Sequence, residues 1–188
     1  DKMNNRGLCK LLIINAGNAN AHTGKNGIKT IDKYVLAAAK YFNCKKSQVL
    51  VSSTGVIGEK LNANKIIKVF PTILKSKTKN LLSASKAIMT TDTYPKIIVK
   101  KIKINSKIIK IFGFAKGSGM IFPNMGTMLS YIFIEANLSK GILKKILHSN
   151  LDSSFNSISV DGDTSTSDTL MLFSLSDRDQ KKIKSLNI

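Results

Sequence analysis

Histidine and cysteine are scarce in this 188-residue sequence, which has two of each, and tryptophan is absent. Zinc sites need several histidines and cysteines at close spacing, and His22 and His148 stand alone, so the sequence predicts no metal site. Cys9 and Cys44 lie far apart and lack the framework of spaced cysteines found in small secreted proteins. They are therefore predicted to be free thiols.

Acidic residues and arginine are also rare. The chain has 11 Asp and Glu against 30 Lys and Arg, for a formal net charge of +19, and only Arg6 and Arg178 are arginines. Such a charge suggests a lysine-rich nucleic-acid-binding module, which remains one alternative. However, proteins that read bases and phosphates rely on arginine forks and stacking aromatic residues, whereas these lysines are spread along the chain. We therefore expect no nucleic-acid partner.

Long apolar runs are missing as well. No stretch approaches the roughly 18 apolar residues that a membrane-spanning helix needs. The first residues, 1–6, are polar or charged and lack the apolar core of a signal peptide. The sequence thus predicts a cytoplasmic protein with no membrane partner, and its length favours a single domain over residues 1–188.

Hydrophobic periodicity predicts strands that alternate with helices. Strands are expected at 8–14, 48–52, 128–135 and 157–160, and helices at 30–42, 64–74, 81–89, 139–150 and 177–186. Thr30 or Asp32 is the expected cap of the first helix, and Pro71 should kink or end the second. Residues 97–104 and 107–115 flank a two-residue turn and predict a β-hairpin. These elements indicate an α/β or α+β fold.

Three turn-rich segments are candidates for a functional site. Residues 115–129 hold glycines, a proline and one lysine between apolar runs, a density typical of unusual backbone near a site. Residues 53–58 place two glycines beyond a strand, where backbone N–H groups can meet a developing negative charge. Residues 161–169 carry alternating acids but lack the glycine and glutamate of an EF-hand, so we interpret them as a capping turn that supports a nearby group.

Several short stretches, taken together, resemble the bifunctional ornithine acetyltransferase/glutamate N-acetyltransferase family of arginine biosynthesis. They lie in the family's order along nearly the whole chain, and this order is far more specific than any one of them. The matching stretches are residues 15–20, 53–58, 87–93 with 95–96, 116–121 with 123–125, 127–129, 154–156, and 161–166 with 168–169.

The resemblance implies a precursor that cleaves itself between Gly126 and Thr127. The products would be an alpha-chain part, 1–126, and the start of a beta-chain part, 127–188, whose N-terminal Thr127 is the catalytic nucleophile. A threonine hydroxyl needs a base, and a freed α-amine with a pKa near ~8 can serve as one. A cationic Lys116 nearby would push that amine toward its neutral form.

The same resemblance implies roles for other residues. Thr54 and Gly55 would form the oxyanion hole, and Lys116, Thr127 and a threonine of the segment 90–93, of which Thr93 is preferred, would bind substrate. N2-acetylornithine would give its acetyl group to Thr127, ornithine would leave, and glutamate would accept the acetyl group. No metal or organic cofactor is implied, although acetyl-CoA is a co-substrate in some members.

The resemblance also implies an assembly and a fold. The cleaved alpha and beta chains would form a hetero-oligomer, and the fold would be α/β with stacked sheets between helix layers. The family's chain is longer than this one, so a central fragment is expected. Gly126, Phe122 and Ser167 depart from the family pattern, which has alanine, a small or polar residue, and asparagine. A self-cleaving amidohydrolase or aminopeptidase with the same nucleophile remains a second alternative.

Overall fold

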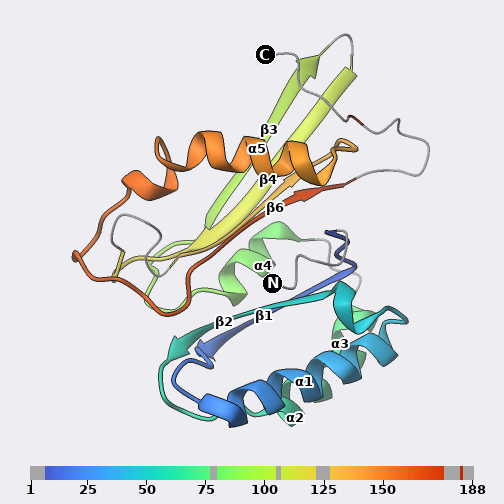
Figure 1. Ribbon diagram of the computed structural model, residues 1–188, viewed down its shortest axis with the longest axis vertical. Helices are drawn as coiled ribbons and strands as arrows, with labels where there is room; N and C mark the ends of the chain where they lie inside the picture. The colour runs from blue at the N-terminus through green and yellow to red at the C-terminus, as the bar shows by residue number, and fades with distance from the viewer. Residues whose placement is uncertain (1–6, 77–79, 105–106, 122–127, 176–182, 184–188) are drawn as a thin grey trace. The chain divides into compact units, whose positions relative to one another are not determined.

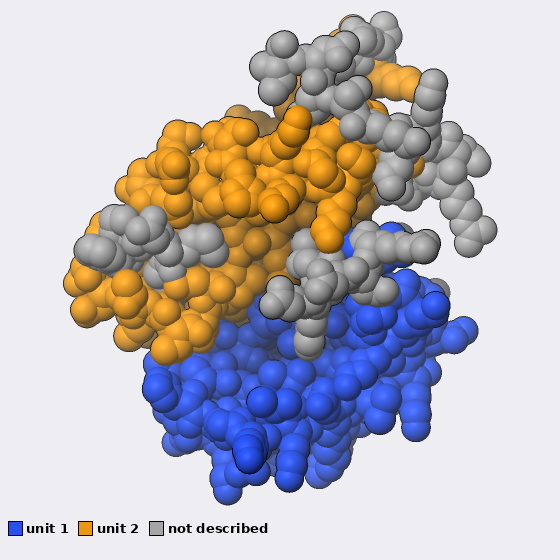
Figure 2. Space-filling model, in the orientation of Figure 1, with its two compact units in different colours: residues 1–80 blue, residues 81–188 orange. Residues whose placement is uncertain are grey.

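The computed structural model describes residues 7–76, 80–104, 107–121, 128–175 and 183. The chain divides into two compact units, residues 1–80 and 81–188, coloured separately in Figure 2. Each unit has its own sheet and helices, which confirms the predicted α+β class. Because each unit is described by itself, the single domain and the stacking of the sheets stay predictions.

The first unit is built on a strand–helix–strand element (Figure 1). Strands β1 (Leu11–Asn18) and β2 (Val49–Val56) pair in parallel, and helix α1 (Gly24–Tyr41) connects them. Parallel neighbours need such a crossover, since a tight turn cannot join their ends. Apolar residues three and four positions apart on α1 form one buried face against the sheet. The core consists of Tyr34, Val35, Ala38, Ala39, Val49, Ala63 and Phe70.

The helix predicted over 64–74 is interrupted. The 3-10 turn η2 (Lys46–Gln48) precedes β2, and helices α2 (Ala63–Lys68) and α3 (Phe70–Lys75) follow it. The Asn62 side chain caps α2 by accepting the N–H groups of Asn64 and Lys65 at 3.0 and 3.4 Å. Pro71 lies in the first turn of α3, where its missing N–H costs nothing, so the predicted break at this proline is confirmed.

Helix α1 begins six residues before its predicted start at Thr30 (30 − 24 = 6). Its cap is Thr23, so the prediction of Thr30 or Asp32 as the cap is wrong. The first turns hold glycine and lysine and lack an apolar stripe, which leaves no periodicity to read. Gly27 is nevertheless buried, because it brings the helix close to the preceding loop.

The second unit contains a four-stranded sheet in the order β3-β4-β5-β6. Its elements are α4 (Leu81–Ala87), β3 (Lys96–Ile104), β4 (Lys107–Lys116), β5 (Leu129–Ile134), α5 (Lys140–Leu151), the 3-10 turn η3 (Phe155–Ser157) and β6 (Thr169–Ser174). β3 and β4 form the predicted antiparallel hairpin, whose turn lies outside the described residues. β5 and β6 are parallel, and α5 is the crossover between them (Figure 1).

Aromatic side chains from three neighbouring strands stack across this sheet. The ring centroids of Phe112 and Phe133 lie 5.1 Å apart, and those of Phe133 and Phe173 lie 5.0 Å apart. Cross-strand aromatic pairs of this kind stabilise a sheet by roughly 0.2–1 kcal/mol each. The ladder therefore fixes the register of β4, β5 and β6, which carry the residues of the candidate site.

Three predictions for the C-terminal third need comment. The prediction of a strand at 157–160 is wrong, because residues 155–157 form η3 and Val160 makes only an isolated bridge with Ile121. The segment 161–169 leads into strand β6, so the capping interpretation is wrong as well. Except for Ile183, the helix predicted at 177–186 lies outside the described residues.

Two findings concern the cysteines and the helices. Cys9 and Cys44 are both free thiols, as expected. Among the described residues, every helix is too short or too polar to cross a membrane.

Candidate active site

Thr54 and Gly55 lie near the end of β2, opposite Ala16 and Gly17 of β1. Thr54 is only 2% exposed. Gly55 has a φ of +128°, and a Cβ atom there would lie 2.5 Å from the backbone nitrogen of Asn18 and overlap the Gly17 backbone. Glycine is required here by both the conformation and the close approach of β1.

Asparagine side chains hold the ends of these two strands. Asn15 accepts a hydrogen bond from the Ser53 hydroxyl at 2.7 Å and donates one to the carbonyl of Asn18 at 2.8 Å. The Asn18 amide in turn donates to the carbonyl of Glu59 at 3.2 Å. Loops beyond a sheet leave backbone groups without ladder partners, and these amides satisfy them. These contacts tie together the strand ends on either side of Thr54 and Gly55.

Lys116 ends strand β4 in the second unit and is 2% exposed. Its ammonium donates a hydrogen bond to the Thr90 hydroxyl at 3.2 Å. Burial lowers the pKa of Lys116 below its ordinary value; the nearby charge of Lys96 acts in the same direction, and the carboxylates of Asp92 and Asp168 partly offset both. A buried cation with this mixture of neighbours is typical of a functional site.

Asp92 is the main counter-charge of this cluster, and its side chain is 1% exposed. Its carboxylate accepts the Lys96 ammonium at 2.6 Å and the Gly117 N–H at 2.7 Å. Burial alone would raise the pKa of Asp92, but the hydrogen bonds from Lys96, Gly117 and Thr90, together with the Lys96 charge, hold it below its ordinary value. Asp92 thus joins the threonine segment to the end of β4.

Asp168 lies immediately before β6 and accepts the N–H of Met128 at 3.2 Å. The carbonyl of Met128 accepts the N–H of Thr169 at 2.9 Å, so both backbone groups of Met128 are held. Burial raises the pKa of Asp168, while the Met128 and Ser165 hydrogen bonds and the Lys116 charge act against the rise. The residue that follows Thr127 in the chain is therefore fixed beside a half-buried carboxylate.

The glycine-rich loop after Lys116 is fastened to the segment before β6. Ile121 exchanges two backbone hydrogen bonds with Val160, one of them at 2.8 Å. Asp161 accepts the N–H of Met120 at 3.3 Å, and a Cβ atom on Gly119 would lie 2.5 Å from the same carboxylate oxygen. The expectation that residues 161–169 support a nearby group is confirmed by these contacts and by those of Asp168.

The structure brings together some of the predicted site residues and adds others. Lys116 contacts Thr90, whereas Thr93 is exposed, so the binding role of Thr93 stays a prediction. Gly126 and Thr127 lie outside the described residues. Asp92 and Asp168 were missed as site residues, although both belong to stretches that carry the family resemblance. Their hydrogen bonds to distant backbone groups were the missing signal, and the sequence does not reveal those contacts.

Metal-binding groups are the remaining question at this site. Across the described part of the chain, no three His, Cys, Asp or Glu side chains gather closely enough to hold a metal ion. The groups that the described part of the site offers are a buried ammonium, a buried and a half-buried carboxylate, and hydroxyl groups.

The fold is that of a bacterial protein whose crystal structure has been solved. The crystal structure of arginine biosynthesis bifunctional protein argJ from Bacillus halodurans matches with a TM-score of 0.57 and 35% sequence identity, over 68% of this chain and 66% of that one. This likeness covers most of the described structure and is supported by sequence identity as well as by fold.

The chain belongs to the ArgJ family, whose sequence model matches residues 1–187. It is 46% identical over 168 residues to the Arginine biosynthesis bifunctional protein ArgJ of Bartonella henselae, covering 89% of this chain and 41% of that protein. The protein of the same name from Gluconobacter oxydans is 44% identical over 179 residues, or 95% of this chain and 42% of that protein. The chain thus spans about two fifths of the length of these relatives.

Proposed function

We propose that this chain carries part of the active site of an acetyltransferase that moves an acetyl group from N2-acetylornithine to glutamate. The observation that carries the proposal is the cluster at the start of β5, where the buried Lys116 pairs with Leu129 and Asp168 accepts the N–H of Met128. Met128 directly follows Thr127, the proposed nucleophile. The family membership supplies the substrates and the reaction.

Maturation begins with the Thr127 hydroxyl, which attacks the carbonyl carbon of Gly126. The bond between the Gly126 carbonyl carbon and the Thr127 nitrogen then breaks, which leaves Gly126 as an ester on the Thr127 oxygen and frees the α-amine of Thr127. Water hydrolyses this ester, so that Gly126 becomes a carboxyl terminus and the Thr127 hydroxyl is restored. That amine, with an unperturbed pKa near ~8, is the base for the hydroxyl of the same residue. The ammonium of Lys116 favours the neutral form of the amine by charge repulsion.

Acetyl transfer then proceeds in two half-reactions. The Thr127 hydroxyl oxygen attacks the acetyl carbonyl carbon of N2-acetylornithine, its proton passes through the α-amine to the departing nitrogen, and ornithine leaves. The glutamate amine next attacks the acetyl ester, and the threonine oxygen regains a proton. Thr54 and Gly55 donate to the oxyanion of each tetrahedral intermediate, and one such donor contributes about 3–4 kcal/mol.

Two carboxylates position these groups. Asp92 orients Thr90 and the backbone after Lys116, and Asp168 holds the backbone beside the nucleophile. The Lys116–Thr90 hydrogen bond supports Thr90 as the threonine that contacts the amino-acid substrate. Thr93 is kept as a second substrate contact, because its hydroxyl is exposed on the same segment.

The remaining parts of the proposal concern cofactors, assembly and location. The reaction as written needs no metal or organic cofactor, and acetyl-CoA would be an additional acetyl donor. The two products of cleavage at Gly126–Thr127 are proposed to stay together as a hetero-oligomer. A cytoplasmic location is proposed because the relatives are bacterial proteins named for biosynthesis.

Intact-mass spectrometry of the purified protein tests the nucleophile first. We expect two pieces in the wild type, one of which begins at Thr127, and a single piece in Thr127→Ala. A Ser130→Ala variant is the matched control, since it removes a hydroxyl within β5 instead and should still be cleaved. An uncut wild-type chain, or cleavage in Thr127→Ala, would contradict the role of Thr127.

An acetyl-transfer assay tests the reaction. Lys116→Met should lower kcat/KM for transfer from N2-acetylornithine to glutamate by at least about a hundredfold, because a buried charged contact of about 3 kcal/mol is lost. Lys103→Met, on the exposed strand β3, should leave the rate unchanged. Release of free acetate at the full rate without glutamate would instead favour the amidohydrolase alternative.

A further inference from the structure

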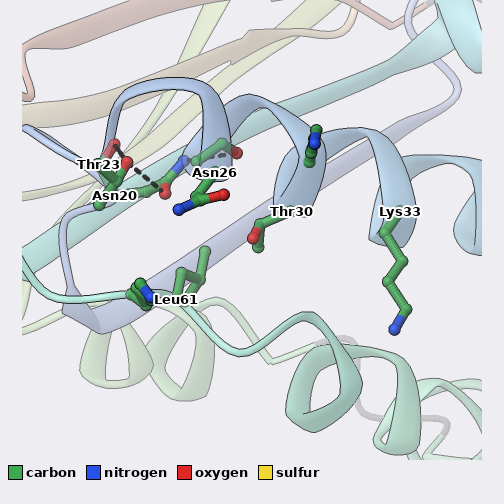
Figure 3. Close-up of a pocket in the computed structure, with 9 residues that line it drawn as sticks. Asn20, Thr23, Asn26, Thr30, Lys33 and Leu61 are labelled. Carbon is green, nitrogen blue, oxygen red and sulfur yellow. Dashed lines mark hydrogen bonds between the residues drawn. The ribbon is translucent and has the colours of Figure 1, made fainter.

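A pocket of about 340 Å³ opens in the first unit, between the first half of α1 and the segment around Leu61. Figure 3 shows Asn26, Thr30 and Lys33 projecting from α1 on the side that faces this segment. We call it the lysine pocket. It is lined by Asn20, Thr23, Asn26, Gly27, Lys29, Thr30, Lys33, Lys60 and Leu61. None of these residues has a part in the proposed acetyl transfer.

One wall of the lysine pocket is a fixed polar corner. The Thr23 hydroxyl donates to the side-chain oxygen of Asn20 at 3.1 Å, and the Asn20 amide donates to the carbonyl of Gly27 at 3.4 Å. A Cβ atom on Gly27 would lie 2.8 Å from the Asn20 oxygen and would overlap the Thr23 hydroxyl. The absence of a side chain at Gly27 thus lets the loop pack against the helix and shapes the wall in advance.

Three lysines supply the charge. Lys29 and Lys33 are one helical turn apart on α1, and Lys60 comes from the opposite segment. Within the described residues, none of the three makes an ion pair, and the lining contains no acidic residue. Like charges at this helical spacing repel each other, so a bound anion would relieve an unfavourable arrangement.

The start of α1 adds to this potential. The first turn of the helix contains no acidic residue, and the Thr23 side chain does not cap it. The positive end of the helix dipole is therefore not offset by a local carboxylate, and Asn26 and Gly27 of this turn line the pocket. The dipole and the lysines favour the same sign of ligand charge.

We propose that the lysine pocket binds a small phosphate-bearing anion with at least two negative charges. A lysine ammonium can bind phosphate as a point charge with freely rotating donors, and three such groups around one pocket suit an anion whose oxygens point in several directions. The amides and hydroxyls of Asn20, Asn26 and Thr30 add hydrogen-bonding groups for the same oxygens. A volume of about 340 Å³ leaves room for more than one phosphate group.

The pocket is also tied to the predicted oxyanion hole within this unit. The N–H of Gly58 donates a hydrogen bond to the carbonyl of Ala21 at 2.9 Å. Ala21 lies just before Thr23 and Gly58 lies just before Lys60, so this bond joins the two walls of the pocket close to Gly55. The binding itself does not depend on acetyl transfer. Its test uses no turnover, so its failure would leave the proposed function untouched.

Calorimetric titration of the protein with pyrophosphate at fixed ionic strength tests the proposal. We expect saturable binding to one site in the wild type. The double variant Lys33→Gln/Lys60→Gln should weaken it by about tenfold or more for each lysine, the size of a charged hydrogen bond. Lys100→Gln/Lys103→Gln on exposed strand β3 removes the same charge elsewhere and should change the affinity less than twofold.

Two results would overturn the proposal. Equal losses in the pocket variant and the β3 variant would mean that pyrophosphate responds only to the net charge of the chain. Citrate binding as tightly as pyrophosphate to the wild type, with the same dependence on Lys33 and Lys60, would mean that the pocket takes polycarboxylates rather than phosphates. Circular dichroism of each variant checks that the fold is retained.

Discussion

Replacing Asp92 with asparagine removes a buried negative charge and little else. Asparagine has nearly the same shape as aspartate, so packing around the site should be retained. What changes is the balance of charge, because Asp92 accepts hydrogen bonds from Lys96 and Gly117 and faces the buried ammonium of Lys116. The variant therefore isolates the electrostatic contribution of this one carboxylate.

The expected loss in free energy of unfolding at pH 7 is about 3 kcal/mol. Removing one partner of a buried ion pair costs about 3–5 kcal/mol, since the other charge is left without compensation. We expect the lower end of that range for two reasons. The Lys96 side chain is 31% exposed and regains contact with water, and Lys116 still has the charge of Asp168 nearby.

The pH dependence distinguishes charge from shape. Because the pKa of Lys116 in the folded state is below its ordinary value of ~10.4, the unfolded chain binds more protons in the window between them, and stability rises with pH there. Asp92 raises the pKa of Lys116, so this pKa falls further in Asp92→Asn and the window opens at lower pH. The destabilisation should therefore shrink between pH 7 and pH 10.

At acid pH, the stability difference between wild type and variant shrinks as the pH falls rather than as it rises. The pKa of Asp92 in the folded state is below its ordinary value of ~3.9, so its contribution is present above that value and is lost as the pH falls through the folded pKa. The wild type should thus lose its advantage over the variant below about pH 4. Both windows come from the same buried contacts.

Urea unfolding of wild type, Asp92→Asn and Asp163→Asn at pH 3, 7 and 10 is the assay. Asp163 is exposed in the same unit, so its variant should change the free energy of unfolding by less than about 0.5 kcal/mol. A loss in Asp92→Asn that stays below 1 kcal/mol, or that is the same at all three pH values, would refute the reasoning.

Three further predictions concern single residues. Gly55→Ala should lower the free energy of unfolding in urea by about 3 kcal/mol, because the added Cβ is strained and overlaps the Gly17 backbone. Gly58→Ala, at a φ of +86° and with open space around it, should lower it by only about 1 kcal/mol. Equal losses would contradict the close approach of β1 to Gly55. Burial raises the pKa of Tyr34 to about 12 against an opposing hydrogen bond with Ser53, so stability should fall as the pH rises from about 10 through 12. Phenolate absorbance should then have one late step that coincides with unfolding, and its absence would place Tyr34 in solvent. Ser139→Ala removes the cap of α5 and should cost about 1 kcal/mol, with an unchanged midpoint counting against the cap.

Much of the local structure was predictable from the sequence. Apolar runs at 8–14 and 128–135 marked strands, although the first one begins three residues later than expected (11 − 8 = 3). Pro71 marked a helix break because its ring and missing N–H act on its own neighbours. The family motifs likewise made Lys116 a candidate site residue, and the structure shows it buried at the end of β4. Each of these signals is short-range or is carried by residue type.

The residues that were missed lack such a local signal. The start of α1 was not predicted, because its first turns lack apolar periodicity. Gly27 is buried there only through its packing against Asn20 and Thr23. Strand β6 was not predicted, because its apolar run does not indicate which strand it pairs with. Only the parallel pairing with β5 defines it as a strand. Such packing is a property of the folded chain, and composition does not encode it in readable form.

The sequence by itself determined the family, the local elements and the residue types available for chemistry. Only the tertiary structure decided which of those residues meet: Lys116 with Thr90, 26 positions away, and Asp168 with Met128, 40 positions away. Charge and burial at such contacts depend on how the chain closes on itself, because an aspartate has an ordinary pKa in water and a shifted one only when its neighbours and its exposure are fixed. The same is true of the lysine pocket, whose two walls are separated along the chain and are brought together by the parallel strands β1 and β2.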